Sequence, residues 1–213
     1  MKHLLIVGAR GFGREALRTF FKSDAYKNGE VEIKGFLDSD SHILDGLKGN
    51  FPKIICAPED YVIEEDDVFF VAMGFPKWRK HYADMLEAKG AKFFTIISEN
   101  ATVFETATIG DGCFIGNSSI VSDNVKLGKH VLVLDLCTLG HDAQIGDCST
   151  MEAYSFVGGY SSVGEQSVMH VHSTLIRHKS IGNNVEVGSS SVVIRNVKDD
   201  CHVFGNPAKK IDL

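Results

Sequence analysis

From Ile97 onward, an aliphatic residue, counting methionine, recurs at every sixth position of this chain for seventeen positions without a break. The series is Ile97, Val103, Ile109, Ile115, Val121, Leu127, Val133, Leu139, Ile145, Met151, Val157, Val163, Met169, Leu175, Ile181, Val187 and Val193. A period of six matches neither an amphipathic helix, which repeats about every 3.6 residues, nor an alternating strand, which repeats about every 2 residues. The repeat must therefore be a supersecondary unit that stacks on copies of itself.

Two further registers accompany the aliphatic one. Glycine, which suits a sharp backbone corner, often follows the aliphatic residue, as at Gly110, Gly116, Gly128, Gly140, Gly146, Gly158, Gly164, Gly182 and Gly188. The residue two places before it is usually small, which leaves room for the aliphatic side chain. Three hexads make one triangular coil of a parallel β-helix, so that equivalent residues of successive coils stack at the strand spacing of about 4.8 Å. Residues 97–198 then form nearly six coils.

Composition narrows the class of protein. The 213 residues are 44% hydrophobic and 23% charged, as in ordinary globular proteins. No segment reaches the roughly 18 apolar residues of a membrane span, and the apolar start is too short for a signal peptide, so we expect a cytoplasmic protein without membrane insertion. A net charge of −6 argues against nucleic acid as a partner. Of the five cysteines, Cys113 and Cys137 fall on the small register, which predicts core filling in place of disulfides or metal ligation.

The first part of the chain, residues 1–94, predicts an α/β, Rossmann-like domain ahead of an all-β domain at 95–213. A buried strand at residues 2–9 runs into the turn Gly8-Ala9-Arg10-Gly11-Phe12-Gly13, and a helix follows at about 14–21. Free backbone N–H groups at such a helix start favour an anion, and glycine lets a phosphate approach. The spacing is G-x-x-G-x-G and differs from the dinucleotide fingerprint, which argues against a dehydrogenase.

Two more expected strands end in candidate binding residues. The strand at 32–37 ends in Asp38, the strand at 68–73 ends at Gly74, and the helix at 77–89 carries Arg79. Ligands bind beyond the carboxyl ends of strands in an open α/β sheet. The candidate substrate-binding residues are therefore Gly8, Arg10, Gly11, Phe12, Gly13, Asp38, Gly74 and Arg79. In the alternative interpretation the glycines only permit turns, Asp38 caps a helix and Arg79 lies on a solvated face.

The six-residue signature resembles that of the hexapeptide-repeat acyltransferases, and Gly205-Asn206-Pro207-Ala208-Lys209 looks like the G-x-P-A-K segment that closes many of them. With the glycine turn, the strand end Gly35-Phe36-Leu37-Asp38 and a His-Asp pair, the chain looks like the sialic-acid O-acetyltransferase and bacillosamine or perosamine N-acetyltransferase group. This resemblance implies a left-handed β-helix, a front domain that holds a nucleotide-linked sugar, acetyl-CoA as co-substrate and a homotrimer.

The segment from Gly140 to Asp147 carries the candidate chemistry. It resembles the family's H-[DE]-x-x-I-G-[DE] motif, in which the histidine is the base, and a histidine with a pKa near 6.5 suits proton transfer at neutral pH. We therefore expect His141 to be the general base. Asp142 matches the acidic position and is the first candidate to orient the imidazole, and Asp123, one coil earlier, is the second. The resemblance also implies cofactor contacts at Gly159, Val171 and Ser189.

The leading hypothesis is an acetyl-CoA-dependent acetyltransferase that acts on an amino group, in preference to a hydroxyl, of a nucleotide-activated sugar in surface glycan synthesis. Leu134 and Phe12 depart from the family pattern, which leaves the sugar open. The first alternative is a zinc lyase like the γ-class carbonic anhydrases, with His170, His172 and His178 as ligands. A non-catalytic nucleotide-sugar-binding protein is the second. No metal is expected under the leading hypothesis.

Overall fold

The computed structural model describes residues 1–212, and the chain forms two compact units. The first unit spans Met1–Glu99, and the second begins at Asn100. Among the described residues, no helix has both the length and the apolar character needed to cross a membrane.

The first unit is a five-stranded parallel sheet with helices, and its strand order is β3-β2-β1-β4-β5. Its elements are β1 (Lys2–Val7), α1 (Gly11–Phe20), α2 (Asp24–Lys27), β2 (Val31–Leu37), β3 (Ile54–Cys56), β4 (Asp67–Val71), α3 (Pro76–Ala88), β5 (Lys92–Phe93) and β6 (Ile96–Ile97). The strand order reverses between β1 and β4, so the carboxyl ends of these two strands flank the position where open α/β sheets bind ligands. The predicted α/β class of this region is confirmed.

Buried apolar strands form the centre of this sheet. Leu4 to Val7 of β1 are fully buried, as expected for a parallel strand that is covered on both faces.

Asp67, at the start of β4, accepts hydrogen bonds from Tyr61 Oη and Lys34 Nζ, both at 2.8 Å. Burial raises the pKa of Tyr61 to about 12, and the bond to Asp67 adds to the effect. A paired and hydrogen-bonded carboxylate can therefore be accommodated in the core.

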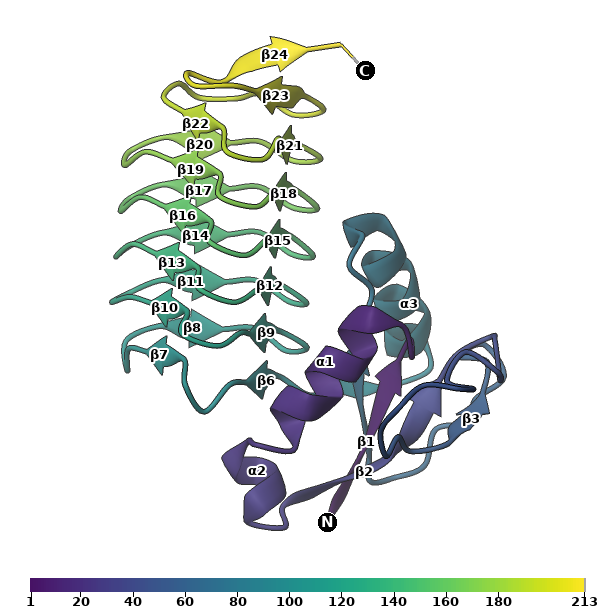
Figure 1. The fold of residues 1–213 in the computed structure, drawn as a ribbon. Helices are drawn as coiled ribbons and strands as arrows, with labels where there is room; N and C mark the ends of the chain where they lie inside the picture. The colour runs from purple at the N-terminus through teal and green to yellow at the C-terminus, as the bar shows by residue number, and fades with distance from the viewer. Residues whose placement is uncertain (213) are drawn as a thin grey trace. The chain divides into compact units, whose positions relative to one another are not determined.

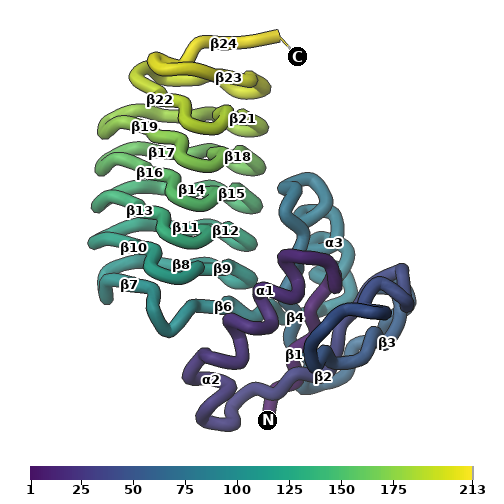
Figure 2. Tube along the Cα trace, viewed as in Figure 1, coloured from purple at the N-terminus to yellow at the C-terminus, as the bar shows by residue number. Residues whose placement is uncertain are grey.

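The second unit is a parallel β-helix whose coils stack one above another (Figures 1 and 2). Its strands are β7 (Thr102–Val103), β8 (Thr108–Ile109), β9 (Phe114–Ile115), β10 (Ile120–Val121), β11 (Lys126–Leu127), β12 (Leu132–Val133), β13 (Thr138–Leu139), β14 (Gln144–Ile145), β15 (Thr150–Met151), β16 (Phe156–Val157), β17 (Ser162–Val163), β18 (Val168–Met169), β19 (Thr174–Leu175), β20 (Ser180–Ile181), β21 (Glu186–Val187), β22 (Val192–Val193), β23 (His202–Phe204) and β24 (Lys209–Ile211). The last two strands pair antiparallel and end the helix.

Three faces make up the β-helix, and each is one sheet. Within the second unit, their strand orders are β22-β19-β16-β13-β10-β7, β20-β17-β14-β11-β8 and β24-β23-β21-β18-β15-β12-β9. From β7 to β19, each strand pairs in parallel with the strand three places later, so that Leu139 lies beside Val157, one coil further on. The expected fold class, an α/β unit followed by a β-helix of hexapeptide repeats, is confirmed.

The aliphatic register fills the inside of the helix. Leu139, Met151 and Val157 are fully buried, and so are Cys113 and Cys137, which confirms the predicted core role of the two thiols. Burial raises the pKa of Cys137 to about 12, so this thiol stays protonated.

Serines of the small register also donate hydrogen bonds to carbonyl groups of the next coil, for example from Ser149 Oγ to Gly164 O at 2.6 Å and from Ser167 Oγ to Gly182 O at 2.7 Å. The predicted series is wrong at its first member, because Ile97 is 36% exposed and Ile96 is buried in its place.

The glycine register has a different cause from the one expected. A Cβ on Gly140 would lie 2.6 Å from the backbone nitrogen of Gly159 in the next coil, so glycine is required by close stacking. The backbone corner lies two residues further on, where every sixth residue from Gly112 to Ser190 has φ between 52° and 71°. Nearly all of these left-handed positions carry side chains, including Asn124 and Asp142. Each corner therefore carries an ordered row of stacked side chains, some exposed, as at Tyr154 and Tyr160, and some buried, as at His130 and Cys148.

Candidate active site

His141 and Asp142 lie at the corner between β13 and β14. His141 Nδ1 and Asp142 Oδ2 are 2.8 Å apart, and the histidine side chain is 58% exposed. An ionised carboxylate can only accept a hydrogen bond, so the pairing places the proton on Nδ1 and leaves Nε2 as the basic nitrogen. The pair therefore has the form of an imidazole base with a carboxylate that orients it.

Asp142 is held from a second side. Asn124 Nδ2, one coil earlier, donates to Asp142 Oδ1 at 2.6 Å. The hydrogen bond with His141, followed by that with Asn124, lowers the pKa of Asp142. Asp123, the other expected partner of His141, instead accepts a hydrogen bond from Thr106 Oγ1 at 3.0 Å. Sequence reasoning missed Asn124, although counting one coil back from Asp142, as well as from His141, would have found it.

Gly159 and Tyr160 lie one coil above the pair. A Cβ on Gly159 would be 3.0 Å from His141 Nε2 and 3.1 Å from Cε1, so glycine leaves space at the basic nitrogen. The Tyr160 ring meets the imidazole edge-on with centroids 4.9 Å apart, and His178 stacks on the other side of Tyr160 at 5.0 Å. Aromatic rings thus border His141 on the side of the later coils.

Val171 and Ser189 lie at a different corner, between the sheet that contains β18 and β21 and the sheet that contains β19 and β22. Both residues are exposed. The backbone groups of Val171 already have partners, because its N–H donates to Glu152 Oε2 at 3.1 Å and its carbonyl accepts from Ser190 N at 2.9 Å. Of the three expected cofactor residues, only Gly159 shares the corner of His141.

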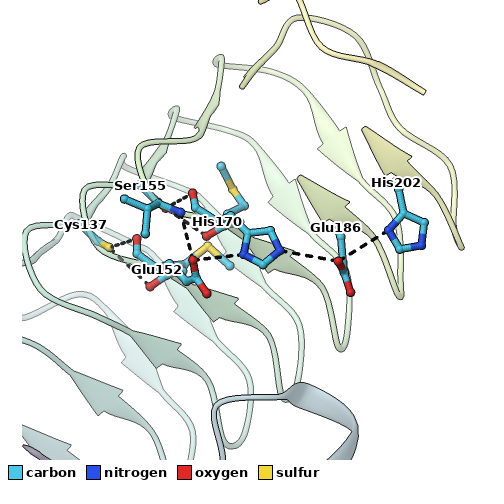
Figure 3. A network of polar contacts seen from close by, with 9 residues as sticks. Cys137, Glu152, Ser155, His170, Glu186 and His202 are labelled. Carbon is cyan, nitrogen blue, oxygen red and sulfur yellow. Dashed lines mark hydrogen bonds and ion pairs between the residues drawn. The ribbon is translucent and has the colours of Figure 1, made fainter. Parts of the chain in front are cut away.

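The histidines of the zinc alternative have separate partners. His170 Nδ1 lies 3.1 Å from Glu152 Oε2, and Glu186 Oε2 lies 3.6 Å from both His170 Nε2 and His202 Nδ1 (Figure 3). The hydrogen bond with Glu152 raises the pKa of His170. His172 instead stacks on a tyrosine, Tyr154, at 4.5 Å. Within residues 1–212, no group of three or more histidine, cysteine or carboxylate side chains is arranged to hold a metal ion.

The glycine turn of the first unit brings the start of α1 against the end of β1. Gly8 has φ of 96°, and a Cβ on Gly13 would collide with the Gly8 carbonyl oxygen. Gly11 is exposed, and a Cβ there would meet nothing within 4 Å. Arg10 is the N-cap of α1 and makes no side-chain capping bond. The N–H groups of the first helical turn therefore lack a capping side chain, which suits an anion.

The acidic candidate, Asp38, and the basic candidate, Arg79, each hold a different loop in place. Asp38 Oδ2 accepts from Ala9 N at 2.8 Å, and Oδ1 accepts from Asp40 N at 3.0 Å, so this carboxylate ties the end of β2 to the glycine turn. Arg79 is fully buried, which corrects the expectation of direct substrate contact. Its Nη1 donates to the carbonyl oxygens of residues 73 and 74 at 2.6 and 3.0 Å and fixes the loop between β4 and α3.

The two other candidates of this group differ in exposure. Phe12 is half-buried, with its ring 6.1 Å from that of Phe70 in an edge arrangement. Gly74 is exposed, and a Cβ there would meet nothing within 4 Å. The exposed members of the predicted set thus gather at the turn after β1 and at the end of β4, the two strand ends where the sheet order reverses.

Comparison with known proteins covers both units. Residues 3–86 match the family model of the PglD N-terminal domain. A search of curated proteins finds no match to this chain. Among solved structures, the acetyltransferase domain of PglB from Neisseria gonorrhoeae FA1090 is 26% identical with a TM-score of 0.86, and the match covers 99% of this chain and 100% of that one. The same domain in complex with acetyl coenzyme A is 25% identical over 99% of both chains, with a TM-score of 0.88.

Two further structures share the fold. A mutant of perosamine N-acetyltransferase from Caulobacter crescentus, in complex with CoA and GDP-perosamine, is 18% identical with a TM-score of 0.87, and covers 100% of this chain and 98% of its own. WeeI from Acinetobacter baumannii AYE is 21% identical with a TM-score of 0.84, and covers 99% and 100%. The chain thus joins a PglD N-terminal domain to a left-handed β-helix, which is the architecture of the β-helix sugar acetyltransferases, the family that the sequence predicts.

Proposed function

We propose that the protein transfers the acetyl group of acetyl-CoA to an amino group of a nucleotide-activated sugar, with His141 as the general base. The observation that carries this proposal is the pairing of His141 Nδ1 with Asp142 at 2.8 Å, with Gly159 leaving space beside Nε2. The PglB acetyltransferase domain, which was solved with acetyl coenzyme A, and the perosamine N-acetyltransferase, which was solved with CoA and GDP-perosamine, support both substrates.

The proposed reaction is a direct attack on the thioester. The amine nitrogen of the sugar forms a bond to the acetyl carbonyl carbon, His141 Nε2 takes the proton that the amine releases, and the bond from carbon to sulfur breaks. The CoA thiolate leaves and receives a proton. Asp142 keeps Nδ1 protonated and stabilises the imidazolium that forms in between.

Replacing His141 by alanine tests the assignment. We expect His141→Ala to lower kcat by about 10²- to 10⁴-fold, the usual contribution of a positioned base, while binding of coenzyme A survives. His42→Ala is the matched control, because His42 Nδ1 also pairs with a carboxylate, Asp45, at 2.8 Å but lies in the first unit. Release of CoA thiol across a panel of nucleotide-linked amino sugars measures turnover. Unchanged turnover in His141→Ala would overturn the proposal, and no thiol release from the wild type with any sugar would favour a non-catalytic binding protein.

For the predicted Rossmann-like domain, residues 1–94, which lies within the first unit, we propose the nucleotide-sugar site. The uncapped start of α1 and the exposed Gly11 offer backbone N–H groups to a diphosphate, and Asp38 holds the turn in that shape. A thermal-shift panel of nucleotide sugars tests this, because a ligand of the native state raises its stability. If no nucleotide sugar raises the melting temperature above that of the ligand-free protein, the proposal is contradicted.

A homotrimer would complete the cofactor site. Gly159 and the pair Val171 and Ser189 lie at the two corners that border the β7-to-β22 face, so a cyclic assembly built on this face would bring one corner of each chain against the other corner of its neighbour. That face exposes large apolar side chains, namely Phe104, Ile120, Phe156 and Ile194. We expect sedimentation analysis to give a trimer, and a monomer of full activity would refute this part. The proposed setting is cytoplasmic surface-glycan synthesis, since acetyl-CoA and nucleotide sugars are cytoplasmic metabolites.

A further inference from the structure

Asp142 has two carboxylate oxygens, and each has its own partner. Oδ2 pairs with His141 Nδ1 at 2.8 Å, and Oδ1 accepts from Asn124 Nδ2 at 2.6 Å. Asn124 lies one coil before Asp142 on the same corner. Its backbone N–H donates to Thr106 Oγ1 at 2.8 Å, so Asn124 is itself attached to the coil below.

We propose that Asn124 is a positioning residue for the acetyl transfer: it fixes the plane of the Asp142 carboxylate, and through it the direction of His141 Nε2. The inference rests on the proposed function. A carboxylate held at one oxygen can rotate about its Cβ–Cγ bond, whereas a carboxylate held at both oxygens cannot. The imidazole is 58% exposed, and its hydrogen bond to Asp142 is the polar contact that sets its orientation.

Of the other ionisable groups around the pair, Asp123 is bound elsewhere, and Tyr160 reaches Asp142 from the later coil, opposite Asn124. Asp123 accepts from Thr106 Oγ1 at 3.0 Å. Tyr160 borders the imidazole from the coil above, and its hydroxyl contributes weakly to the lowered pKa of Asp142. His178 stacks on Tyr160 and not on His141. Asn124, an uncharged side chain in the preceding coil, is thus the group that holds Asp142 from that side.

The backbone of Asn124 determines which variants are informative. Its φ is 54°, a left-handed conformation that asparagine, aspartate and glycine tolerate better than alanine does. Asn124→Gly removes the amide without adding strain. Asn124→Asp keeps the shape but places a second carboxylate opposite Asp142 Oδ1, where the two repel. Alanine would mix loss of the bond with backbone strain.

A matched control lies at another corner of the same β-helix. Asn184 has φ of 52°, and its Nδ2 donates to Asp200 Oδ1 at 3.2 Å. This pair repeats the amide-to-carboxylate bond, but no histidine pairs with Asp200 among the described residues. Asn184→Asp should therefore lower stability to the same small extent as Asn124→Asp and leave turnover and its pH dependence unchanged.

The test measures kcat, KM for acetyl-CoA and the pH profile of kcat/KM. We expect Asn124→Gly to lower kcat by about tenfold with KM within about twofold, because the group orients the base and does not touch the cofactor. In Asn124→Asp the added negative charge should stabilise the imidazolium, so the acidic limb of the profile moves to higher pH. Asp142 has φ of 62°, so glycine is also the suitable replacement there. In the Asp142→Gly background, Asn124→Gly should cost nothing further, since Asn124 acts through Asp142.

Three outcomes would overturn the inference. The first is a wild-type kcat and pH profile in both Asn124 variants. The second is a loss of kcat in Asn184→Asp equal to that in Asn124→Asp, which would assign the effect to general stability. The third is a full additional loss from Asn124→Gly in the Asp142→Gly background. If His141→Ala itself retains turnover, the proposed function fails, whereas inactive His141→Ala with wild-type Asn124 variants refutes only the positioning role.

Discussion

Adding one methyl group to Gly159 should disturb the proposed base directly. The new Cβ would lie 3.0 Å from His141 Nε2 and 3.2 Å from the His141 carbonyl oxygen. Ordinary contact between such atoms needs about 3.5 Å. Either the imidazole or the coil must therefore move by roughly 0.5 Å in Gly159→Ala.

The size of the effect follows from this displacement. A misplacement of about 1 Å costs on the order of 10²-fold in rate, so a shift of half that distance should cost about tenfold in kcat, or about 1.4 kcal/mol. The crowding should also destabilise the fold by about 1 kcal/mol and lower the melting temperature by about 2 to 4 °C.

Steady-state kinetics separates the two roles that Gly159 could have. If the methyl group displaces the imidazole, kcat falls and KM for acetyl-CoA stays nearly constant. If Gly159 only contacts the cofactor, KM rises and kcat is preserved. Turnover and melting temperature both equal to those of the wild type would refute the placement of His141 Nε2 beside Gly159.

Two further predictions concern the first unit and the His170 network. Gly13→Ala should destabilise the protein by about 2 kcal/mol in denaturant unfolding, because its Cβ would collide with the Gly8 carbonyl, whereas Gly11→Ala, with open space at that position, should be nearly neutral. The pKa of His170 is raised by its hydrogen bond with Glu152, so its contribution to stability is complete below the unfolded pKa of about 6.5 and is lost as pH rises through the folded pKa. Glu152→Gln should lower the His170 pKa in an NMR titration and weaken that pH dependence; an unchanged titration would refute the pairing.

The fold could be predicted from the sequence where a strict period connects residues to positions in space. The six-residue register places Leu139 and Met151 inside, and both are fully buried. The helix α2 and the strand β3, of four and three residues, are too short to show a period, and the sequence did not indicate them. The glycine register was found but misinterpreted, because whether a glycine serves a corner or a close approach depends on the next coil.

The candidate site was predictable at the level of residue types and only partly at the level of contacts. Counting by coils brings Asp123 below His141, but the left-handed backbone at each corner turns the next residue, Asp142, back toward the imidazole. Arg79 was expected to contact substrate or, in the alternative, solvent, and only the packed structure shows that its guanidinium is buried and donates to loop carbonyl groups. Such side-chain directions depend on packing and not on spacing.

The stacking of equivalent corners also limits how a chain of this kind can change length. A strand at one face pairs with the strand three places later, so inserting or deleting one whole coil, 18 residues, keeps every later residue on its own face and corner. A change of a single hexad would instead carry every later residue to the neighbouring corner, and between Asn124 and Asp142 it would put these two residues at different corners. We therefore expect tolerated length variation in this half of the chain to come in whole coils, each of which moves the end of the helix by about 4.8 Å.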